Sequence, residues 1–405
     1  MQVDQLRFTE EGYNILRNVV PTSQLESLRT NIEHMVNRRK EISAQRRLPN
    51  EPRGGAWEAS AQPRLKFDTD CDEVSASAIE FLLHENTLGV SQQLMAAKHV
   101  VPHQFGCICS GSKDVGPMRW HRDVGPGEPA PLRGMISNMD HHGPSYLQWN
   151  IALYDDSVFW IVPRSHRRIN TDEENRQLAE NPSVPLLGGM PVELNAGDGV
   201  VYTHLLLHWG SYYSSRMRRT LHPGYRPFGF VALPNVHWRH WEPGFYHHLS
   251  RAARQQFEAW DALFFEEFDL IAEIFHTFIN RDTDGFLAGL GKLHPSPYDR
   301  MVSIVMLSKL AGNLYKLKHT TANPASLWGN GRDITYLGNR FTAQQVAELW
   351  QRFQALDEKL KLPEERHHPG FQRRSEYNSN DMPADFEVED FIASWENVSA
   401  SQQSA

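Results

Sequence analysis

The sequence is poor in three things: cysteine, long apolar runs and net positive charge. Its 405 residues include only three cysteines, too few for a disulfide framework, which favours a reducing compartment such as the cytoplasm. The longest apolar runs, such as 158–163 and 301–307, are far shorter than the roughly 20 residues that a membrane helix needs. Acidic residues outnumber basic ones by 49 to 41, and the formal charge of −8 disfavours a role dominated by nucleic-acid binding. We therefore expect a cytoplasmic protein with no membrane or nucleic-acid partner.

What the sequence does have is the composition of a folded globular chain, because 40% of its residues are hydrophobic. Residues 13–20 have the pattern of a strand. After Pro21, apolar residues recur with the 3.6-residue period of a helix, at Leu25, Leu28, Ile32 and Met35. The polar stretch 40–70, which is rich in proline and glycine, predicts a long loop that forms part of a lid.

Residues 98–232 change to short apolar runs separated by turn residues, a pattern that predicts an antiparallel sandwich or barrel. Beyond residue 244 the apolar residues return to helical spacing, and from about residue 373 the chain is polar and acidic. We therefore expect a first domain over 1–243 that contains the β core, a helical extension over 244–372 and a mobile acidic tail over 373–405.

The strongest local signal for chemistry is the pair His121 and Asp123. Residues i and i+2 of a strand point to the same face, so this imidazole and this carboxylate can reach one point in space. His208, which follows a turn and a strand, is the best candidate for a third ligand, and His204 is its rival. Two histidines and one carboxylate leave three positions open on a metal, which suits non-heme Fe(II) better than the tetrahedral sets typical of zinc.

A second signal follows ten residues after His208. Arg218 and Thr220 stand at i and i+2 on an expected strand, so a guanidinium fork and a hydroxyl lie side by side. This pair is what the distal carboxylate of a dicarboxylic acid requires. Arg219 would face the other way, and it is the alternative if the register is shifted by one residue.

Four stretches together resemble a known family. They are 8–16 with the helix after Pro21, 120–123, 147–166 and 197–218. They are similar to the entry segment, the first metal motif, the central strands and the closing strands of the phytanoyl-CoA dioxygenase family of Fe(II)- and 2-oxoglutarate-dependent oxygenases. The resemblance covers about residues 8–225, a little over half of the chain.

The resemblance implies a double-stranded β-helix, a jelly-roll or cupin-like barrel, flanked by N-terminal helices and the C-terminal helical extension. It implies that His121, Asp123 and His208 hold Fe(II). It further implies that Arg218 and Thr220 anchor 2-oxoglutarate and that Gln148 lines the co-substrate pocket.

The implied activity is that of a dioxygenase that uses O2, hydroxylates a small-molecule metabolite and releases succinate and CO2. The presence of Asp123 favours hydroxylation over halogenation, because related halogenases bind a halide where this carboxylate would stand. One departure lies near the substrate side, where Arg164 replaces the glycine of the family's Pro-Gly-Ser-His segment.

Two other interpretations stay open at this point. One is a non-catalytic relative that binds a small molecule or a partner through the same barrel. The other is a cupin-like metal enzyme that does not use 2-oxoglutarate. The C-terminal helices are candidates for a dimer interface or for a cover over the pocket, and the sequence does not choose between these roles.

Overall fold

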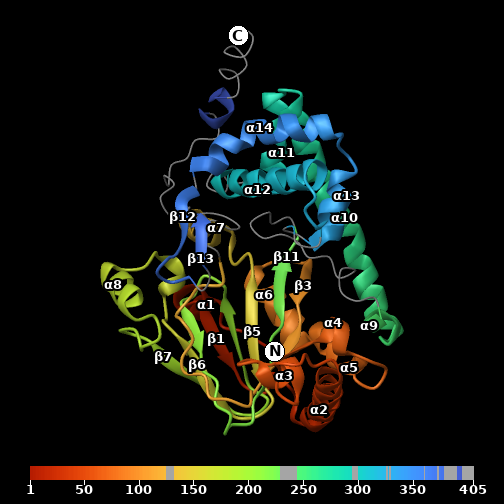
Figure 1. Ribbon diagram of the computed structural model, residues 1–405, viewed down its shortest axis with the longest axis vertical. Coiled ribbons are helices and arrows are strands. Elements are labelled where there is room, and N and C mark those ends of the chain that lie inside the picture. The colour runs from red at the N-terminus through yellow and green to blue at the C-terminus, as the bar shows by residue number, and fades with distance from the viewer. Residues whose placement is uncertain are drawn as a thin grey trace.

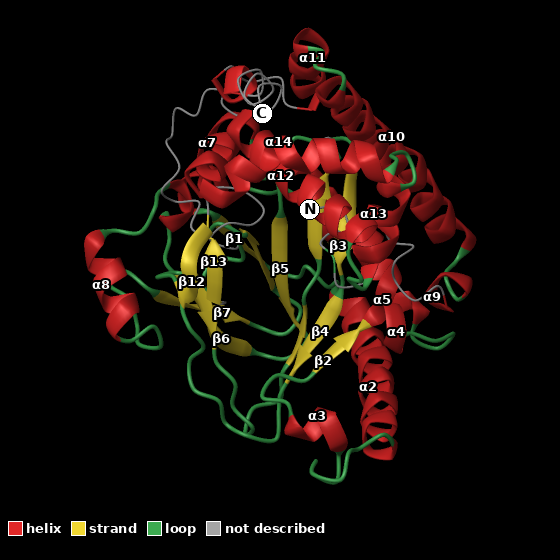
Figure 2. Ribbon diagram, turned by 45° about the horizontal axis from the view of Figure 1, so that its top comes forward, coloured by secondary structure: helices red, strands yellow, loops and turns green. Residues whose placement is uncertain are grey.

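The computed structural model describes residues 1–124, 132–228, 244–293, 300–324, 327, 330–359, 361–371, 374–377 and 390–394. Two antiparallel sheets lie in its lower half beside the N-terminal helices, and the C-terminal helices lie above them (Figure 1); Figure 2 shows the same strands in a view turned by 45°. The large sheet follows the strand order β1-β8-β5-β10-β4-β2, with β11 pairing both β5 and β3, and the small sheet follows the order β7-β6-β9. The strands are β1 (Tyr13–Leu16), β2 (Arg64–Lys66), β3 (Val100–Gln104), β4 (Gly106–Cys109), β5 (Leu147–Ala152), β6 (Asp156–Ile161), β7 (Met190–Leu194), β8 (Gly199–Thr203), β9 (His208–Gly210), β10 (Arg219–Leu221) and β11 (Gly224–Pro227).

One face of the large sheet packs against N-terminal helices. Four residues on this face pair with one another across neighbouring strands, and all four are buried: Leu65, Cys107, Leu221 and Ile151. They belong to one apolar core with Leu28, Ile32 and Met35 of α2, so the periodic apolar face predicted after Pro21 is the face that covers the sheet. The helices on this side are α1 (Gln5–Glu11), α2 (Thr22–Gln45), α3 (Gly55–Ala59), α4 (Phe67–Asp70), α5 (Ala76–Glu80) and α6 (Val90–Met95).

The opposite face, which we call the inner face, looks toward the small sheet. Because side chains alternate along a strand, the neighbours of the outer residues point inward, as Arg64, Ile108 and Thr220 do across β2, β4 and β10. One part of the space between the sheets is filled by an apolar cluster from both of them: Tyr13, Ala152, Phe159, Ile161, Val192, Leu194, Val200, Tyr202 and Leu206. The expectation of antiparallel β structure over 98–232 is therefore confirmed, although two of its strands, β1 and β2, come from outside that range.

The C-terminal helices have an apolar core of their own, with Phe275, Leu307 and Phe353 among its fully buried members. A buried ion pair between Arg226 of β11 and Glu267 of α10 joins these helices to the large sheet. Their bounds are α9 (Gly244–His247), α10 (Arg251–Ile279), α11 (Thr283–Leu293), α12 (Arg300–His319), α13 (Asn330–Gly338) and α14 (Ala343–Lys359). Helices α7 (Leu132–His142) and α8 (Asp172–Glu180) are insertions between strands of the β core. No helix in the described part of the chain is long and apolar enough to cross a membrane.

Two expectations about irregular segments are wrong. The stretch 40–70, expected as a loop, contains the end of α2, the short helices α3 and α4, and β2, because Leu65 and Phe67 are buried in the core. The expected boundary at 372/373 divides a hairpin, since β12 (Lys361–His367) pairs with β13 (Arg374–Tyr377). Neither segment was predicted from its polar composition, because each is stabilised by contacts with residues distant in sequence. The remainder of the expected acidic tail, apart from 390–394, lies outside the described residues.

Candidate metal and co-substrate site

His121, Asp123 and His208 lie together at one end of the space between the sheets. The backbones of His121 and His208 form an antiparallel bridge, with N–H···O distances of 2.9 and 3.0 Å in the two directions. This pairing places the two imidazoles side by side, with ring centroids 4.5 Å apart. The Asp123 carboxylate reaches both rings, at 3.5 Å from Nε2 of His121 and 3.1 Å from Nε2 of His208. One potential ligand atom from each residue lies within 4.8 Å of the other two.

The second nitrogen of each ring fixes its orientation. Nδ1 of His121 is 2.6 Å from the carbonyl oxygen of Arg119, and Nδ1 of His208 is 2.8 Å from that of Leu206. Since a carbonyl oxygen only accepts, each Nδ1 carries the proton and donates it, and each Nε2 keeps its lone pair. That tautomer is the one that metal-binding histidines adopt. The three side chains therefore fit a metal that takes two imidazole nitrogens and one carboxylate oxygen.

The charges of the group suit the same role. Burial, and after it the neighbouring His208, lowers the pKa of His121 to about 4, so this ring is neutral near pH 7. Burial alone would raise the pKa of Asp123, but His208, His121 and the side chain of Gln148 hold that pKa below its usual range. The Asp123 side chain is 29% exposed, whereas the two imidazoles are buried, so the accessible side of the group is the carboxylate side.

His204, the rival of His208, is not part of this group. Its Nδ1 lies 3.2 Å from the carbonyl oxygen of Tyr146, and burial lowers its pKa to about 4. Gln148, by contrast, lies beside Asp123 on the inner face, where β5 pairs Gln148 with Tyr202 of β8. The structure thus places Gln148 next to Asp123, and its role in a co-substrate pocket stays a prediction.

Arg218 and Arg219 point to opposite faces of the large sheet. Arg219 forms an ion pair at 2.8 Å with Glu33 of α2, on the helix-covered face. Arg218 is buried on the inner side, where its Nε donates to Thr220 Oγ1 at 3.1 Å. Its Nη1 is buried and has no hydrogen-bond partner among the described residues. A buried guanidinium nitrogen without an acceptor leaves room in the bonding pattern for an anionic ligand.

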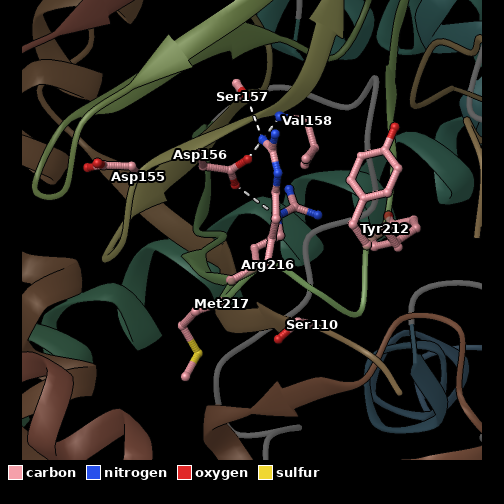
Figure 3. A pocket seen from close by; sticks show the side chains of 10 residues that line it. Ser110, Asp155, Asp156, Ser157, Val158, Tyr212, Arg216 and Met217 are labelled. Carbon is pink, nitrogen blue, oxygen red and sulfur yellow. Dashed lines mark hydrogen bonds and ion pairs between the residues drawn. The ribbon is translucent and has the colours of Figure 1, made fainter. Parts of the chain in front are cut away.

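Asp156, which no sequence pattern indicated, also forms an ion pair with Arg218. Its Oδ2 accepts from Arg218 Nε at 2.8 Å and from the Thr220 hydroxyl at 2.9 Å. Burial would raise the pKa of Asp156, but Arg218 beside it has the opposite effect, and the pKa of Asp156 lies below its usual value. A small recess beside Arg218 is lined by Asp156, Ser157 and Tyr212 (Figure 3). Its volume of about 10 Å³ has room for about one water molecule. The Thr220 hydroxyl is therefore engaged by Asp156, and Nη1 is the atom of the Arg218 guanidinium that remains for another anion.

A second arginine, also missed in the sequence, faces the same space. Arg64 lies on the edge strand β2, and its Nη2 donates to Gln62 Oε1 at 2.6 Å. The amide of Gln62 in turn donates to the Tyr212 hydroxyl, and the Tyr212 ring lies 5.5 Å from the guanidinium carbon of Arg218. Burial, and after it the charge of Arg64, lowers the pKa of His222 to about 4, which places this guanidinium near the inner face.

The segment after β12 supports the extended segment that carries His121 and Asp123. Arg122, between His121 and Asp123, is fully buried, and its backbone N–H donates to the carbonyl oxygen of Gly370 at 2.9 Å. Phe371 packs in an apolar cluster with Val124 and Leu205. The C-terminal part of the chain therefore contributes directly to the position of the segment 121–123.

The structure shows how the turn at Arg164, where the resemblance would place a glycine, is accommodated. Arg164 has a φ of +67°, a conformation that favours glycine. Its guanidinium donates to Glu11 Oε1 from Nε at 2.9 Å and from Nη2 at 2.6 Å, which ties α1 to this turn. The next residue, Ser165, accepts from the backbone N–H of Leu207 at 2.8 Å, just before His208. The turn therefore has Arg164 in a backbone conformation that favours glycine, and the Glu11 ion pair holds the side chain in place.

Comparisons with known proteins give distant structural similarities. No family model and no curated protein matches the chain. HygX from Streptomyces hygroscopicus, solved with nickel and 2-oxoglutarate bound, is 19% identical with a TM-score of 0.42, over 57% of this chain and 88% of HygX. AviO1 from Streptomyces viridochromogenes Tue57 is 18% identical with a TM-score of 0.40, over 56% of this chain and 96% of AviO1. EctD from S. alaskensis, solved with 2-oxoglutarate and 5-hydroxyectoine, is 14% identical with a TM-score of 0.40, over 55% of this chain and 75% of EctD. The function of this chain therefore has to be inferred from its own residues.

Proposed function

We propose that the chain is a cytoplasmic non-heme Fe(II)- and 2-oxoglutarate-dependent oxygenase of the phytanoyl-CoA dioxygenase type, built on a jelly-roll barrel, that hydroxylates a small molecule. The observation that carries the proposal is the convergence of two imidazole Nε2 atoms and one carboxylate, with each Nδ1 already engaged by a carbonyl. A site of this composition leaves part of the metal's coordination sphere open, as non-heme Fe(II) enzymes require. The three free, buried cysteines are consistent with a reducing compartment.

In this proposal His121, Asp123 and His208 hold Fe(II). The metal, with O2 and 2-oxoglutarate, supplies the oxidising chemistry, and the oxidative decarboxylation of 2-oxoglutarate gives succinate and CO2. The protein fixes the two imidazoles by their Nδ1–H bonds and keeps the carboxylate ionised. The buried rings of Phe159 and Tyr202 lie against His208, with ring centroids 5.5 and 5.2 Å away, and exclude water from that side.

Arg218 is the proposed anchor for the distal carboxylate of 2-oxoglutarate. Asp156 and Thr220 hold the Nε edge of the guanidinium, so the carboxylate would be received by Nη1, which is buried and has no partner in the described part of the chain. Thr220 then acts by orienting Asp156 and Arg218, which changes the direct role that the resemblance implied. Gln148, on the inner face beside Asp123, is the proposed polar contact of the co-substrate.

Asp156 also favours a second candidate function. A buried guanidinium that already has a carboxylate partner does not need a dicarboxylic co-substrate to balance its charge. The same site would then be that of a cupin-like metal enzyme that does not use 2-oxoglutarate. The two functions differ in a measurable way, because only the first requires 2-oxoglutarate to chelate the bound metal.

The first experiment is an anaerobic titration of the metal-free protein with Fe(II) and then with 2-oxoglutarate. The proposed function predicts a weak visible metal-to-ligand charge-transfer band that appears only when both are present. Succinate should form on admission of O2, even without substrate, at a slow uncoupled rate. Iron binding without this band would favour the cupin-like enzyme, and absence of iron binding would favour the non-catalytic relative.

Replacing Asp156 by asparagine tests how Arg218 is used. Asp156→Asn leaves Arg218 buried without its counter-charge, so we expect the free energy of unfolding to fall by about 3 kcal/mol. Because the co-substrate carboxylate would supply the missing charge, 2-oxoglutarate should raise the melting temperature of D156N more than that of the wild type. Thermal unfolding with and without 2-oxoglutarate measures both effects. Asp155→Asn is the matched control, since Asp155 is exposed and contacts only the backbone of Ala196 in the described structure. Equal stabilisation of D156N and wild type would argue against an anion at Nη1.

A further inference from the structure

The extended segment 120–123 has a backbone partner on each of its two edges. On one edge the N–H of His121 donates to the carbonyl oxygen of His208, at 2.9 Å. On the other edge the N–H of Arg122 donates to the carbonyl oxygen of Gly370, also at 2.9 Å, and Arg122 forms a parallel bridge with Phe371. The segment that carries two of the possible metal ligands therefore lies between the segment of the third ligand and residues 368–371 from the C-terminal part of the chain.

The Arg122 side chain binds the same C-terminal residues a second time. It is fully buried, and its Nη1 donates to Oδ1 of Asn170. Nδ2 of Asn170 donates in turn to the carbonyl oxygen of Pro369 at 3.0 Å. Nη2 of Arg122 donates to the carbonyl oxygens of Ser165 and Arg168, at 3.2 Å each. Because all of these acceptors are uncharged, replacement of Arg122 breaks these bonds without removing the partner of a buried carboxylate.

Ser165 joins this network to the third ligand. Its carbonyl oxygen accepts from Arg122, and its hydroxyl accepts from the backbone N–H of Leu207 at 2.8 Å. Leu207 immediately precedes His208, so one residue holds both of the segments that carry possible metal ligands. Side chains alternate along an extended segment, and Arg122 therefore points away from the side that the two ligands beside it share. The network supports the ligands from behind.

Gly370 is the most crowded point of this network. Its φ of +79° is a conformation that favours glycine. A Cβ atom on Gly370 would lie 2.9 Å from Nδ2 of Asn170 and 3.1 Å from Nη1 of Arg122, both closer than an ordinary van der Waals contact. A side chain at this position would therefore displace the two groups that hydrogen-bond to each other there, in addition to straining the backbone.

We propose that Arg122 is a positioning residue for the metal site and that, through it, residues 368–371 fix the arrangement of the metal ligands. The proposal rests on the proposed oxygenase function, because it concerns the Fe(II) that those ligands would hold. The C-terminal helical extension then has a role that the sequence left open, since the segment after β12 closes one edge of the ligand-bearing segment. Indirect partners of metal ligands contribute about 10- to 100-fold to metal affinity.

The test compares Gly370→Ala with Gly188→Ala. Gly188 has nearly the same φ, +80°, but nothing lies within 4 Å of its Cβ position, so its variant has the backbone strain without the contact. Anaerobic competition with a chromophoric chelator measures the Fe(II) affinity of the full-length protein, and circular dichroism shows that each variant is folded. We expect the dissociation constant for Fe(II) to rise about tenfold in G370A and to stay unchanged in G188A.

A second measurement separates positioning from a general loss of stability. The visible spectrum of the Co(II)-substituted protein depends on the geometry of its ligands, so it reports how the ligands are arranged in the folded molecules. We expect a changed Co(II) spectrum in G370A and in Arg122→Met. Arg122→Lys keeps the charge and one donor group, and its spectrum should lie closer to that of the wild type.

Two results would overturn the assignment and leave the proposed function intact. One is equal Fe(II) affinity in G370A and G188A, and the other is weaker affinity in G370A with an unchanged Co(II) spectrum, which would indicate lost stability alone. Absence of Fe(II) binding in the wild type would instead contradict the proposed function, and the inference with it. The wild-type titration therefore distinguishes the two kinds of failure.

Discussion

Arg218→Ala should remove 2-oxoglutarate binding while leaving iron binding intact. Arg218 carries an Nη1 without a partner among the described residues, and it does not belong to the group of possible metal ligands. Loss of one partner of a buried, hydrogen-bonded charge pair costs about 2–5 kcal/mol, so we expect the dissociation constant for 2-oxoglutarate to rise at least about 30-fold. The measurement is the charge-transfer band as a function of 2-oxoglutarate concentration at saturating Fe(II).

The design of this experiment has to separate binding from folding. Arg218→Ala leaves Asp156 buried without its counter-charge, so the variant should also be less stable. The double variant R218A/D156A removes both charges, and it should regain stability without regaining the band. Arg219→Ala is the matched control, because Arg219 belongs to the same strand and pairs with Glu33 on the helix-covered face. A normal band in R218A together with a lost band in R219A would reverse the assignment of the two arginines.

Asp123→Ala should abolish tight iron binding. The carboxylate is the one negative charge among the three ligands, and its oxygens lie 3.5 and 3.1 Å from the two Nε2 atoms. Even indirect partners of metal ligands contribute about 10- to 100-fold to metal affinity, so loss of a direct ligand should weaken Fe(II) binding by more than about 100-fold. Anaerobic competition with a chromophoric chelator measures this affinity without any need for substrate.

The same titration decides between the two candidate histidines. His208→Gln should weaken Fe(II) binding as Asp123→Ala does, whereas His204→Gln should retain it, because His204 bonds to the Tyr146 carbonyl and lies outside the ligand group. Circular dichroism of each variant shows whether the fold is retained. Tight iron binding in H208Q with loss in H204Q would show that the ligand group is wrongly assigned.

The parts of the site that the sequence predicted share one property: they depend on local geometry. His121 and Asp123, and likewise Arg218 and Thr220, are two residues apart, and strand alternation alone places each pair on one face. The opposite direction of Arg219 follows from the same rule. The helix after Pro21 was predictable for the same reason, since its apolar residues repeat with the helical period along one continuous segment.

The parts that the sequence missed depend on contacts between distant segments. Asp156 lies 62 residues from Arg218, and no spacing rule connects an acidic residue at the start of β6 with an arginine before β10. Arg64 looked like part of a polar loop, because a three-residue edge strand has too few residues to show alternation. The backbone bond between Arg122 and Gly370 joins segments that no local pattern relates.

The sequence by itself therefore determined which side chains share a face within each strand, the amphipathic character of α2, and the choice of ligand types. Only the tertiary structure decided that His121 and His208 are neighbours, that Asp156 holds Arg218, and that Gly370 binds the backbone of Arg122. The physical reason is that side-chain direction is set by the repeat of one strand or helix. Proximity between elements is instead set by the burial of apolar faces from many parts of the chain at once.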